Sequence, residues 1–225
     1  MIVLAIDTAT PAITAGVVTL GDGAPETLAQ RITVNARAHG ELLTPHVQEA
    51  LAEAGLLLSG IDAIVCGAGP GPFTGLRVGM VTAAAFGDAL GVPVHPVCTL
   101  DAIAADVTSP DRFAVVTDAR RREVYWTAHE PTGARIEGPA VARPADIVGN
   151  LADLGIRTLA GQAATLDADV LALPAIDPAY PSPRGLVAAA AEALRAKATP
   201  APLTPLYLRR PDAMEAVPRK QVTRL

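Results

Sequence analysis

Aromatic residues are scarce in this chain of 225 residues, at 3% of the composition, although 50% of the residues are hydrophobic. The core must therefore be built mainly from alanine, valine and leucine side chains. The chain has 2 cysteines, Cys66 and Cys98, and each lies at the end of an expected strand. This number and placement favour two buried, reduced thiols over a disulfide framework or a metal site.

An excess of basic charge is also missing, since the formal net charge is −5 at pH 7. A protein that grips a phosphate backbone on its own needs a basic face, so direct nucleic-acid binding is disfavoured. No apolar run reaches the ~20 residues that cross a bilayer. The opening run Ile2–Ile6 lacks the basic leader and cleavage pattern of a signal peptide. We expect a soluble, cytoplasmic protein with no membrane association.

A glycine-rich turn at residues 67–79, Gly-Ala-Gly-Pro-Gly-Pro-Phe-Thr-Gly-Leu-Arg-Val-Gly, is the most distinctive feature that the chain does contain. It leaves a strand expected at Ile61–Cys66 and enters an apolar helix expected from Thr74 to about Leu90. Backbone N–H groups at a helix N-terminus bind anions, so such a turn invites a nucleotide-phosphate interpretation. The turn has no Walker lysine and its glycines do not follow G-x-G-x-x-G, so the phosphate interpretation is weak.

The first half of the chain predicts a mixed sheet backed by two helices. Three strands joined by turns predict an antiparallel meander at residues 1–6, 13–20 and 27–35. A helix is expected at His39–Ala54, and its core stripe comprises Leu43, Val47, Ala50, Leu51 and Ala54. Pro45 lies inside this helix, which either kinks there or restarts with Thr44 as its N-cap. Strands at Ile61–Cys66 and Val92–Val97 flank the apolar helix, which implies that they pair in parallel.

The second half opens in the same way as the first. A strand at Phe113–Asp118 ends in an aspartate, as the first strand ends in Asp7, and a polar turn leads to a returning strand at Glu123–His129. A later helix has Ser182 as N-cap and Pro183 at its first position. We expect an α/β fold with two lobes facing a cleft, as in the actin-like and sugar-kinase ATPases. The first lobe would cover residues 1–105, and a smaller second lobe with a C-terminal tail would cover residues 106–225.

Five sequence motifs together resemble the bacterial TsaB (YeaZ) family almost from end to end. They are Asp7-Thr-Ala-Thr10, Arg37–Pro45, Gly69-Pro-Gly-Pro-Phe-Thr-Gly-Leu-Arg77, Asp118–Tyr125 and Pro205-Leu-Tyr-Leu-Arg209. The third motif is the most specific, and it departs from the family only at Pro72, where serine is usual. The resemblance implies an actin-like two-lobed fold and a role in making threonylcarbamoyladenosine beside the tRNA anticodon.

The resemblance also implies partners. In this pathway TsaB is understood to be a noncatalytic subunit that dimerises with and activates its catalytic paralogue TsaD, together with the ATPase TsaE. We therefore expect TsaD and TsaE as partners, a homodimer when the chain is alone, and contact with tRNA only through the complex. No cofactor is expected for the isolated chain, and a nucleotide (ADP or ATP) at the interface of the full complex is left open.

The residues test the noncatalytic expectation. TsaD-like chains hold a metal through two histidines four positions apart, where this chain has Thr99 and Ile103. Threonine and isoleucine cannot replace that imidazole pair, so no metal site is expected. His39 and His46 lie seven apart and are interpreted as ordinary surface or interface histidines. No nucleophile and base can be paired from the sequence, so no catalytic residue is expected.

Two aspartates keep an enzyme alternative open. In actin-like kinases an aspartate at the end of the first strand of each lobe helps to position Mg²⁺ and phosphate. Asp7, followed by Thr8, and Asp118 occupy comparable places. The favoured interpretation is a vestigial nucleotide site whose aspartates now form turns by bonding their own backbone. The alternative is a small-molecule phosphotransferase or ATPase of the actin-like superfamily.

The apolar helix suggests a protein interface. Gly75, Gly79, Ala83 and Gly87 recur every four residues and form a smooth stripe, and the rest of the helix is apolar almost all round. Such a helix needs cover on every side, from another helix of the chain or from a partner. We expect the partner, because family members pair through two helices of the first lobe. The predicted interface comprises Leu42, His46, Glu49, Phe73, Gly75, Val78, Gly79, Ala83, Phe86 and Gly87.

Overall fold

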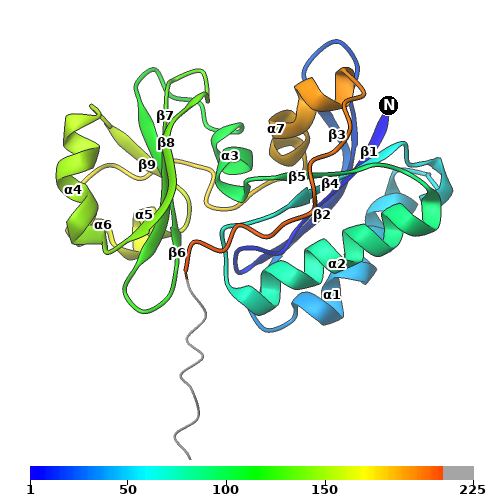
Figure 1. Cartoon of the computed structure of the whole chain (residues 1–225), viewed down its shortest axis with the longest axis horizontal. Helices are drawn as coiled ribbons and strands as arrows, with labels where there is room; N and C mark the ends of the chain where they lie inside the picture. The colour runs from blue at the N-terminus through cyan, green and yellow to red at the C-terminus, as the bar shows by residue number, and fades with distance from the viewer. Residues whose placement is uncertain (210–225) are drawn as a thin grey trace, which may run out of the picture.

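The computed structural model describes residues 1–209, which form two β-sheets flanked by helices (Figure 1). Sheet A has the strand order β3-β2-β1-β4-β5, with β1 (Ile2–Asp7), β2 (Ala12–Thr19), β3 (Glu26–Val34), β4 (Ala63–Gly67) and β5 (Val94–Val97). Sheet B has the order β8-β7-β6-β9, with β6 (Phe113–Asp118), β7 (Val124–His129), β8 (Arg135–Ala142) and β9 (Thr158–Ala160). The predicted two-lobed α/β architecture is confirmed. The part of the predicted tail beyond residue 209 lies outside the described residues.

The two sheets repeat one pattern. β1 pairs antiparallel with β2 and parallel with β4, and β6 pairs antiparallel with β7 and parallel with β9. β2 also pairs antiparallel with β3, and β4 pairs parallel with β5, so the predicted meander and the predicted parallel pairing in sheet A are confirmed. Because parallel strands end at the same edge of a sheet, the carboxyl end of β1 lies beside that of β4. Asp7 and Gly67 meet at this edge, and Asp118 ends the corresponding strand of sheet B.

Helices α1 (His39–Glu53) and α2 (Phe73–Leu90) cover one face of sheet A (Figure 1). The predicted core stripe of α1 is confirmed, since four of its five residues are buried and Ala54 packs at their edge. Of the two alternatives for α1, the restart at Thr44 is wrong, because one helix runs from His39 to Glu53 through Pro45. Proline removes only the bond to the carbonyl of Glu41, a residue that is exposed to water.

The opposite face of sheet A is covered by α7 (Pro183–Arg195), although α7 follows sheet B in the chain. The predicted N-cap is confirmed, because the hydroxyl of Ser182 accepts a hydrogen bond from the N–H of Gly185 at 3.0 Å. The predicted division of the chain at residues 105 and 106 stays a prediction. In space, the return of α7 means that the sheet A core contains residues from both sides of that division.

Sheet B has helices on both of its faces (Figure 1). One of its faces packs against α4 (Pro144–Asp153), α5 (Ala163–Leu166) and α6 (Ala168–Leu171). Its other face packs against the short helix α3 (Thr99–Ala104), where Leu100 and Ile103 contact Phe113 in one buried cluster. This cluster holds the two lobes together. A short 3₁₀ helix, η1 (Leu58–Gly60), leads into β4.

The ends of α2 agree with most of what the sequence predicts. The helix ends at Gly91, whose left-handed backbone (φ 67°) closes it as expected. It begins at Phe73, one residue before the predicted start, with Pro72 at the N-cap position. Among the helices of residues 1–209, none is both long and apolar enough to cross a membrane.

The small-residue stripe of α2 faces inward, which corrects its predicted role as a partner-facing surface. Gly75, Gly79, Ala83 and Gly87 are all buried. A Cβ atom on Gly79 would lie 2.5 Å from the hydroxyl of Thr8, and one on Gly87 would lie 2.3 Å from the side chain of Val94. The stripe therefore lets α2 approach the end of β1 and the strand β5 of its own chain.

The stripe can be tested with alanine. Gly79→Ala should lower the free energy of unfolding by about 1–3 kcal/mol, because the added methyl collides with Thr8. Gly149→Ala is the matched control, since Gly149 lies in α4 with no atom within 4 Å of an added Cβ. This control should raise stability by about 0.5–1 kcal/mol through helix propensity. Urea unfolding measures both, and equal shifts in the two variants would contradict the packing described for α2.

Candidate functional site

Asp7 lies at the carboxyl end of β1 with both carboxylate oxygens occupied. Oδ1 accepts a hydrogen bond from the N–H of Ala9 at 2.8 Å, and Oδ2 accepts one from the hydroxyl of Thr99 at 2.6 Å. The side chain is completely buried. The bond to Ala9 is the turn-forming contact that the sequence favours for this residue. The bond to Thr99 ties β1 to the start of α3.

The glycine loop closes over this turn. A Cβ atom on Gly67 would lie 1.7 Å from Oδ2 of Asp7, and one on Gly71 would lie 2.1 Å from the carbonyl oxygen of Ala9. Gly67 thus lies against the side chain of Asp7 and Gly71 against the backbone of Ala9, and neither position has room for a Cβ atom. Phosphate binding, which the sequence disfavours, would need room above the turn, and Gly67 and Gly71 fill the space directly over Asp7 and Ala9.

Thr8 and Thr10 are held in the same closed arrangement. The hydroxyl of Thr8 donates to the carbonyl of Gly75 at 2.7 Å and accepts from the N–H of Gly79 at 2.8 Å. The imidazole Nε2 of His39 donates to the carbonyl of Thr10 at 2.9 Å. His39 is thus a buried structural histidine. Hydroxyl and amide groups that could have bound a phosphate bond one another instead.

Burial changes the acidity of Asp7. Desolvation raises the pKa of Asp7 to about 6, against the hydrogen bonds from Thr99 and Ala9 and the nearby His39, which lower it. The carboxylate is therefore charged at neutral pH only at a cost in folding free energy. Mg²⁺ is bound through carboxylate oxygens. Both oxygens of Asp7 are buried and accept hydrogen bonds from the protein.

Asp118 forms the corresponding turn in sheet B, but in a more open setting. Its Oδ1 accepts a hydrogen bond from the N–H of Arg120 at 2.7 Å, the same two-residue span as in the Asp7 turn. Its side chain is 28% exposed and pairs with the Arg120 guanidinium at 3.5 Å. Arg120, Arg121 and Arg122 all adopt left-handed backbone conformations, with φ of 63°, 56° and 62°. These three residues form a turn after β6, here called the arginine turn.

The cleft between the two turns is small. It is lined by Thr8, Thr10, Phe73 and Thr74 from the first lobe and by Arg120 from the second, and its volume is about 180 Å³. Ligand sites for nucleotide-sized molecules occupy roughly 300–1,000 Å³. The structure thus brings Thr8 near the second turn, while Asp7 stays sealed beneath the glycine loop and Asp118 lies across the cleft.

A C-terminal segment, residues 200–209, runs from α7 beside sheet A to the end of β6 in sheet B (Figure 1). The N–H of Leu206 donates to the carbonyl of Ala68 at 2.8 Å. The guanidinium of Arg209 donates to the carbonyl of Ala119 at 3.1 Å and pairs with Glu123. The segment thus ties the glycine loop of the first lobe to the arginine turn of the second.

An aromatic stack fixes this segment on α2. The rings of Phe73 and Tyr207 stack with their centroids 5.0 Å apart, and the Arg77 guanidinium lies 3.7 Å from the centre of the Phe73 ring. Arg77 also donates to the hydroxyl of Tyr207 at 2.8 Å. The Pro205–Arg209 motif contributes to the family resemblance, but nothing in the sequence indicates that Tyr207 anchors this segment on α2. Phe73, a predicted interface residue, is 46% exposed and partly engaged by the stack.

Thr99 and Ile103, which stand where TsaD-like chains have their metal-binding histidines, are both buried. Thr99 bonds Asp7, and Ile103 is fully buried between the lobes. No group of three or more His, Cys, Asp or Glu side chains among residues 1–209 is arranged to hold a metal ion. Both cysteines are unpaired, and burial raises the pKa of the Cys66 thiol and raises that of Cys98 to about 11. Neither thiol is a nucleophile at neutral pH.

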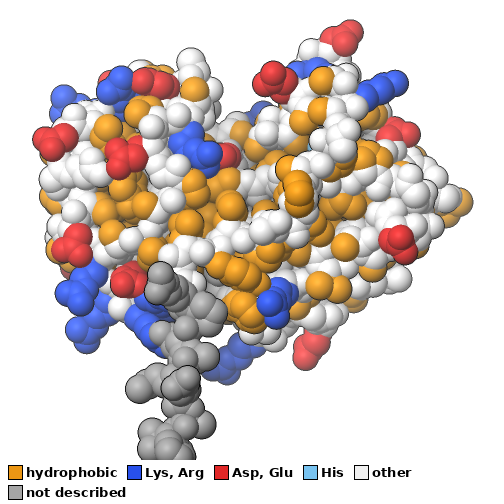
Figure 2. Space-filling model, in the orientation of Figure 1, with side chains coloured by type: hydrophobic (Ala, Val, Ile, Leu, Met, Phe, Trp, Pro, Cys, Tyr) orange, Lys and Arg blue, Asp and Glu red, His pale blue; other side chains and the backbone are white. Residues whose placement is uncertain are grey.

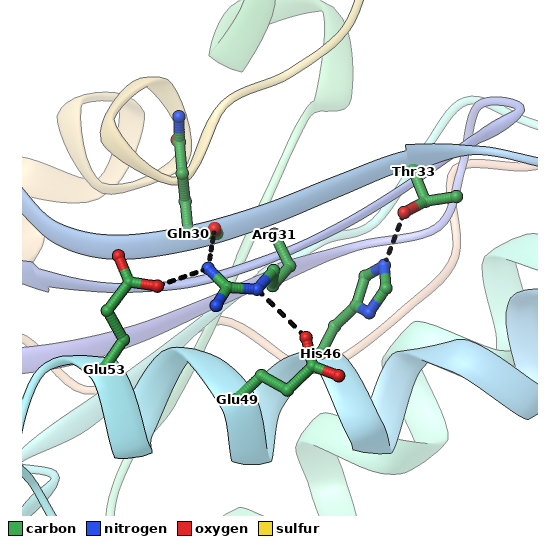
Figure 3. Close-up of polar contacts among 6 residues, drawn as sticks. All are labelled: Gln30, Arg31, Thr33, His46, Glu49 and Glu53. Atoms are coloured by element: carbon green, nitrogen blue, oxygen red, sulfur yellow. Dashed lines mark hydrogen bonds and ion pairs between the residues drawn. The ribbon is translucent and has the colours of Figure 1, made fainter.

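Helix α1 is tied to β3 by residues that sequence reasoning assigned to the interface (Figure 3). The Nε2 atom of His46 and the hydroxyl of Thr33 lie 2.8 Å apart, and His46 is buried. Arg31 pairs with Glu49 at 3.0 Å and with Glu53 at 2.7 Å. His46 is therefore removed from the surface, which corrects its predicted position, while Glu49 stays exposed beside the ion pairs.

The outward face of α2 keeps an exposed apolar patch. Val81 is 66% exposed, and Ala84 and Ala85 are exposed beside it. The predicted interface residues Leu42, Val78 and Phe86 are half-buried at its margin. The interface itself stays a prediction, but its candidate residues are now those on the outer side of α2. Sequence reasoning missed Val81 as the centre of this patch because the small-residue stripe on the other side gave the stronger pattern.

Comparison with known protein families gives one match to most of the chain. The family model described as TsaD, tRNA N6-adenosine threonylcarbamoyltransferase, matches residues 26–217. An uncharacterized protein of Mycobacterium tuberculosis H37Rv is 56% identical over 211 residues, which cover 94% of this chain and 93% of that protein. The tRNA threonylcarbamoyladenosine biosynthesis protein TsaB of Escherichia coli K12 is 35% identical over 133 residues, 58% of this chain and 55% of that protein. The chain spans 56% of the length of a Mycobacterium leprae relative that is 54% identical.

Solved structures agree with the sequence relatives. YeaZ from Pseudomonas aeruginosa superimposes with a TM-score of 0.74 at 28% identity, covering 92% of this chain and 99% of that one. The activator of 2-hydroxyisocaproyl-CoA dehydratase from Clostridium difficile, solved with bound ADPNP, has a TM-score of 0.52 at 10% identity. That second likeness supports the fold alone.

The sealed carboxylate predicts an unusual pH dependence. Because the pKa of Asp7 is higher in the folded state than in the unfolded one, the folded state binds the extra proton between about pH 4 and pH 6. The contribution of Asp7 to stability is therefore lost as the pH rises through this window. Asp7→Asn, which cannot ionise, should gain stability relative to the parent by about 2–3 kcal/mol between pH 4 and pH 7.

Asp7→Ala is the matched comparison. It leaves the N–H of Ala9 and the hydroxyl of Thr99 without their partner, so it should be less stable than Asp7→Asn at pH 7 by about 1–3 kcal/mol. Urea unfolding at pH 4, 5, 6 and 7 measures all three proteins. If the difference in unfolding free energy between the parent and Asp7→Asn does not change with pH, the raised pKa of Asp7 is refuted.

Proposed function

The chain belongs to the TsaB (YeaZ) family, which shares its family model with TsaD, and on that premise we propose that it serves tRNA threonylcarbamoyladenosine biosynthesis as a noncatalytic subunit. In this proposal it binds a TsaD-type transferase in the cytoplasm and stabilises the active conformation of that enzyme. The TsaE-type ATPase joins the assembly, and tRNA is contacted through the complex. The exposed apolar patch on α2 carries the proposal.

The Asp7 turn argues against chemistry by the chain itself. A phosphotransferase needs an aspartate that reaches Mg²⁺, whereas Asp7 is fully buried and both its oxygens accept hydrogen bonds from the protein. The loop above it approaches to contact distance at Gly67 and Gly71. Opening the site would break these contacts together. The fold is thus retained with its phosphate turn converted into a packing element.

The patch on α2 fits a protein partner. Its centre, Val81 with Ala84 and Ala85, is apolar and exposed, and it lies between Arg77 and Asp88 along the helix. Charged groups at the rim of an apolar centre are typical of protein interfaces. On the face shown in Figure 2, hydrophobic side chains are spread over the middle of the molecule, with charged side chains scattered among and around them. This surface suits a protein partner better than a phosphate backbone.

The order of charges along α2 is self-complementary. When two such helices cross about a two-fold axis through the patch, they run antiparallel, and Arg77 of one helix faces Asp88 of the other. Two copies of this chain can pair in that way. A TsaD-type paralogue built on the same fold can present its equivalent helix to the same patch. We propose that the paralogue competes with the homodimer for this surface.

A charge placed at the centre of the patch tests the proposal. Val81→Arg should abolish both homodimerisation and copurification with the TsaD-type protein of the same organism, because burying an unpaired guanidinium costs several kcal/mol. The folded monomer should persist, since Val81 is 66% exposed. Size-exclusion chromatography with light scattering gives the mass, and copurification gives the heteromeric contact.

The matched control is Val148→Arg on α4. Val148 is also an exposed helical valine, at 38%, but it lies on the sheet B side of the molecule. This variant should bind the TsaD-type protein as the parent does. If Val81→Arg still copurifies with the TsaD-type protein at parental yield, the patch is not the docking surface.

A further inference from the structure

A second cavity lies at the opposite end of sheet A from the Asp7 turn. It is bounded by the amino ends of β1, β4 and β5 and by the last turn of α7, and its volume is about 560 Å³. This is within the roughly 300–1,000 Å³ of pockets for small organic ligands. The buried side chains of Ala63 and Leu194 form an apolar floor, and the exposed residues Asp62, Lys197 and Thr199 form the rim. Neither the docking patch nor the Asp7 turn contributes to it.

His95 is the polar group at the floor. It is only 5% exposed, and it makes no hydrogen bond with any of residues 1–209. The other histidines of the chain, which has 4, are all bonded: His39 to Thr10, His46 to Thr33, and His129 to Gly133 and Thr127. Because His95 lines the cavity and its ring nitrogens have no partner in residues 1–209, they are free to form hydrogen bonds with a polar group of a ligand.

The charge state of His95 narrows the class of ligand. Desolvation lowers the pKa of His95 below its ordinary value, so the ring is neutral at physiological pH and offers one N–H donor and one acceptor nitrogen. A hydroxyl group can donate to that nitrogen or accept from that N–H. The inner end of the ligand is therefore expected to carry a neutral hydrogen-bonding group.

A charged residue at the rim of the cavity can bind the outer end of the ligand. Lys197 forms no ion pair with any residue that the structure describes, and it has a left-handed backbone (φ 48°) at the position where a helix usually ends with glycine. Two further charged groups line the cavity. The terminal ammonium of Met1 donates to the carbonyl of Leu20 at 2.9 Å, and Oδ2 of Asp62 accepts a hydrogen bond from the N–H of Ile2 at 2.6 Å. Two positive groups thus stand against one carboxylate, and the net positive charge attracts an anion.

We propose that this cavity binds a small organic carboxylate with a flat or compact apolar body and a hydroxyl group at its far end. The hydroxyl bonds His95, the body packs on Ala63 and Leu194, and the carboxylate pairs with Lys197 at the mouth. Binding by this site is independent of the association proposed for α2. The chain would therefore carry a small-molecule site as well as a docking surface.

The test uses 4-hydroxybenzoate and two probes that each differ from it in one group. Benzoate lacks the hydroxyl, and 4-hydroxybenzyl alcohol has a neutral alcohol in place of the carboxylate. They are titrated into the full-length chain while the imidazole resonances of the histidines are followed by NMR. We expect 4-hydroxybenzoate to shift the His95 resonances with a Kd of about 1 mM or tighter. Benzoate, which leaves His95 unpartnered, should bind about five- to tenfold more weakly. The resonances of His129, whose ring nitrogens are both bonded, are the internal control and should not move.

A variant separates the two ends of the ligand. Lys197→Gln should weaken both carboxylates by about three- to fivefold and leave binding of 4-hydroxybenzyl alcohol unchanged. The proposal would be overturned if none of the probes, at concentrations up to about 20 mM, shifts the His95 resonances. Equal shifts by all three probes, or shifts of His129 as large as those of His95, would also overturn it. The measurements on the parent chain decide the matter even if the variant fails to fold.

Discussion

The backbone contact between the glycine loop and the turn after β1 is the constraint on which the rest of the structure depends. At Gly67 and Gly71 an added Cβ would meet Asp7 or the carbonyl of Ala9, and at Gly79 it would meet Thr8. Because the loop lies so close, α2 starts directly above the end of β1 and its small-residue side packs inward. Its apolar outer side is then left uncovered. One close approach thus both buries the Asp7 turn and leaves the exposed patch on α2.

The two lobes show what that contact changes. Asp7 and Asp118 make the same two-residue backbone bond at the ends of equivalent strands, yet one carboxylate is fully buried and the other is 28% exposed. In residues 1–209, no glycine approaches Asp118 as Gly67 approaches Asp7, and Arg120 of the arginine turn lines the cleft. The segment that ends at Arg209 then links the two turns. Such an arrangement fixes the lobes relative to each other, which suits a subunit that acts by presenting a surface.

Local signals made much of this fold predictable. Alternating strands, the Ser182 cap and Gly91 after α2 act over a few residues, so the sequence carries them directly. The direction of the Gly75–Gly87 stripe could not be predicted, because four-residue spacing shows that one side of a helix is smooth but not what lies against it. The partner of Asp7, Thr99, is 92 residues away, and the burial of His46 and His95 depends on which strand each one meets. Those facts arise from tertiary packing, which a single sequence does not encode locally.

The central claim is that the chain works by association and not by phosphate chemistry at Asp7. Reconstituted threonylcarbamoyl transfer to tRNA, with the TsaD-type and TsaE-type proteins of the same organism, tests it most directly. We expect transfer to require this chain and to continue at the parental rate when Asp7→Asn replaces the parent. Transfer that proceeds equally well without the chain, or that is abolished by Asp7→Asn while the complex still assembles, would contradict the account.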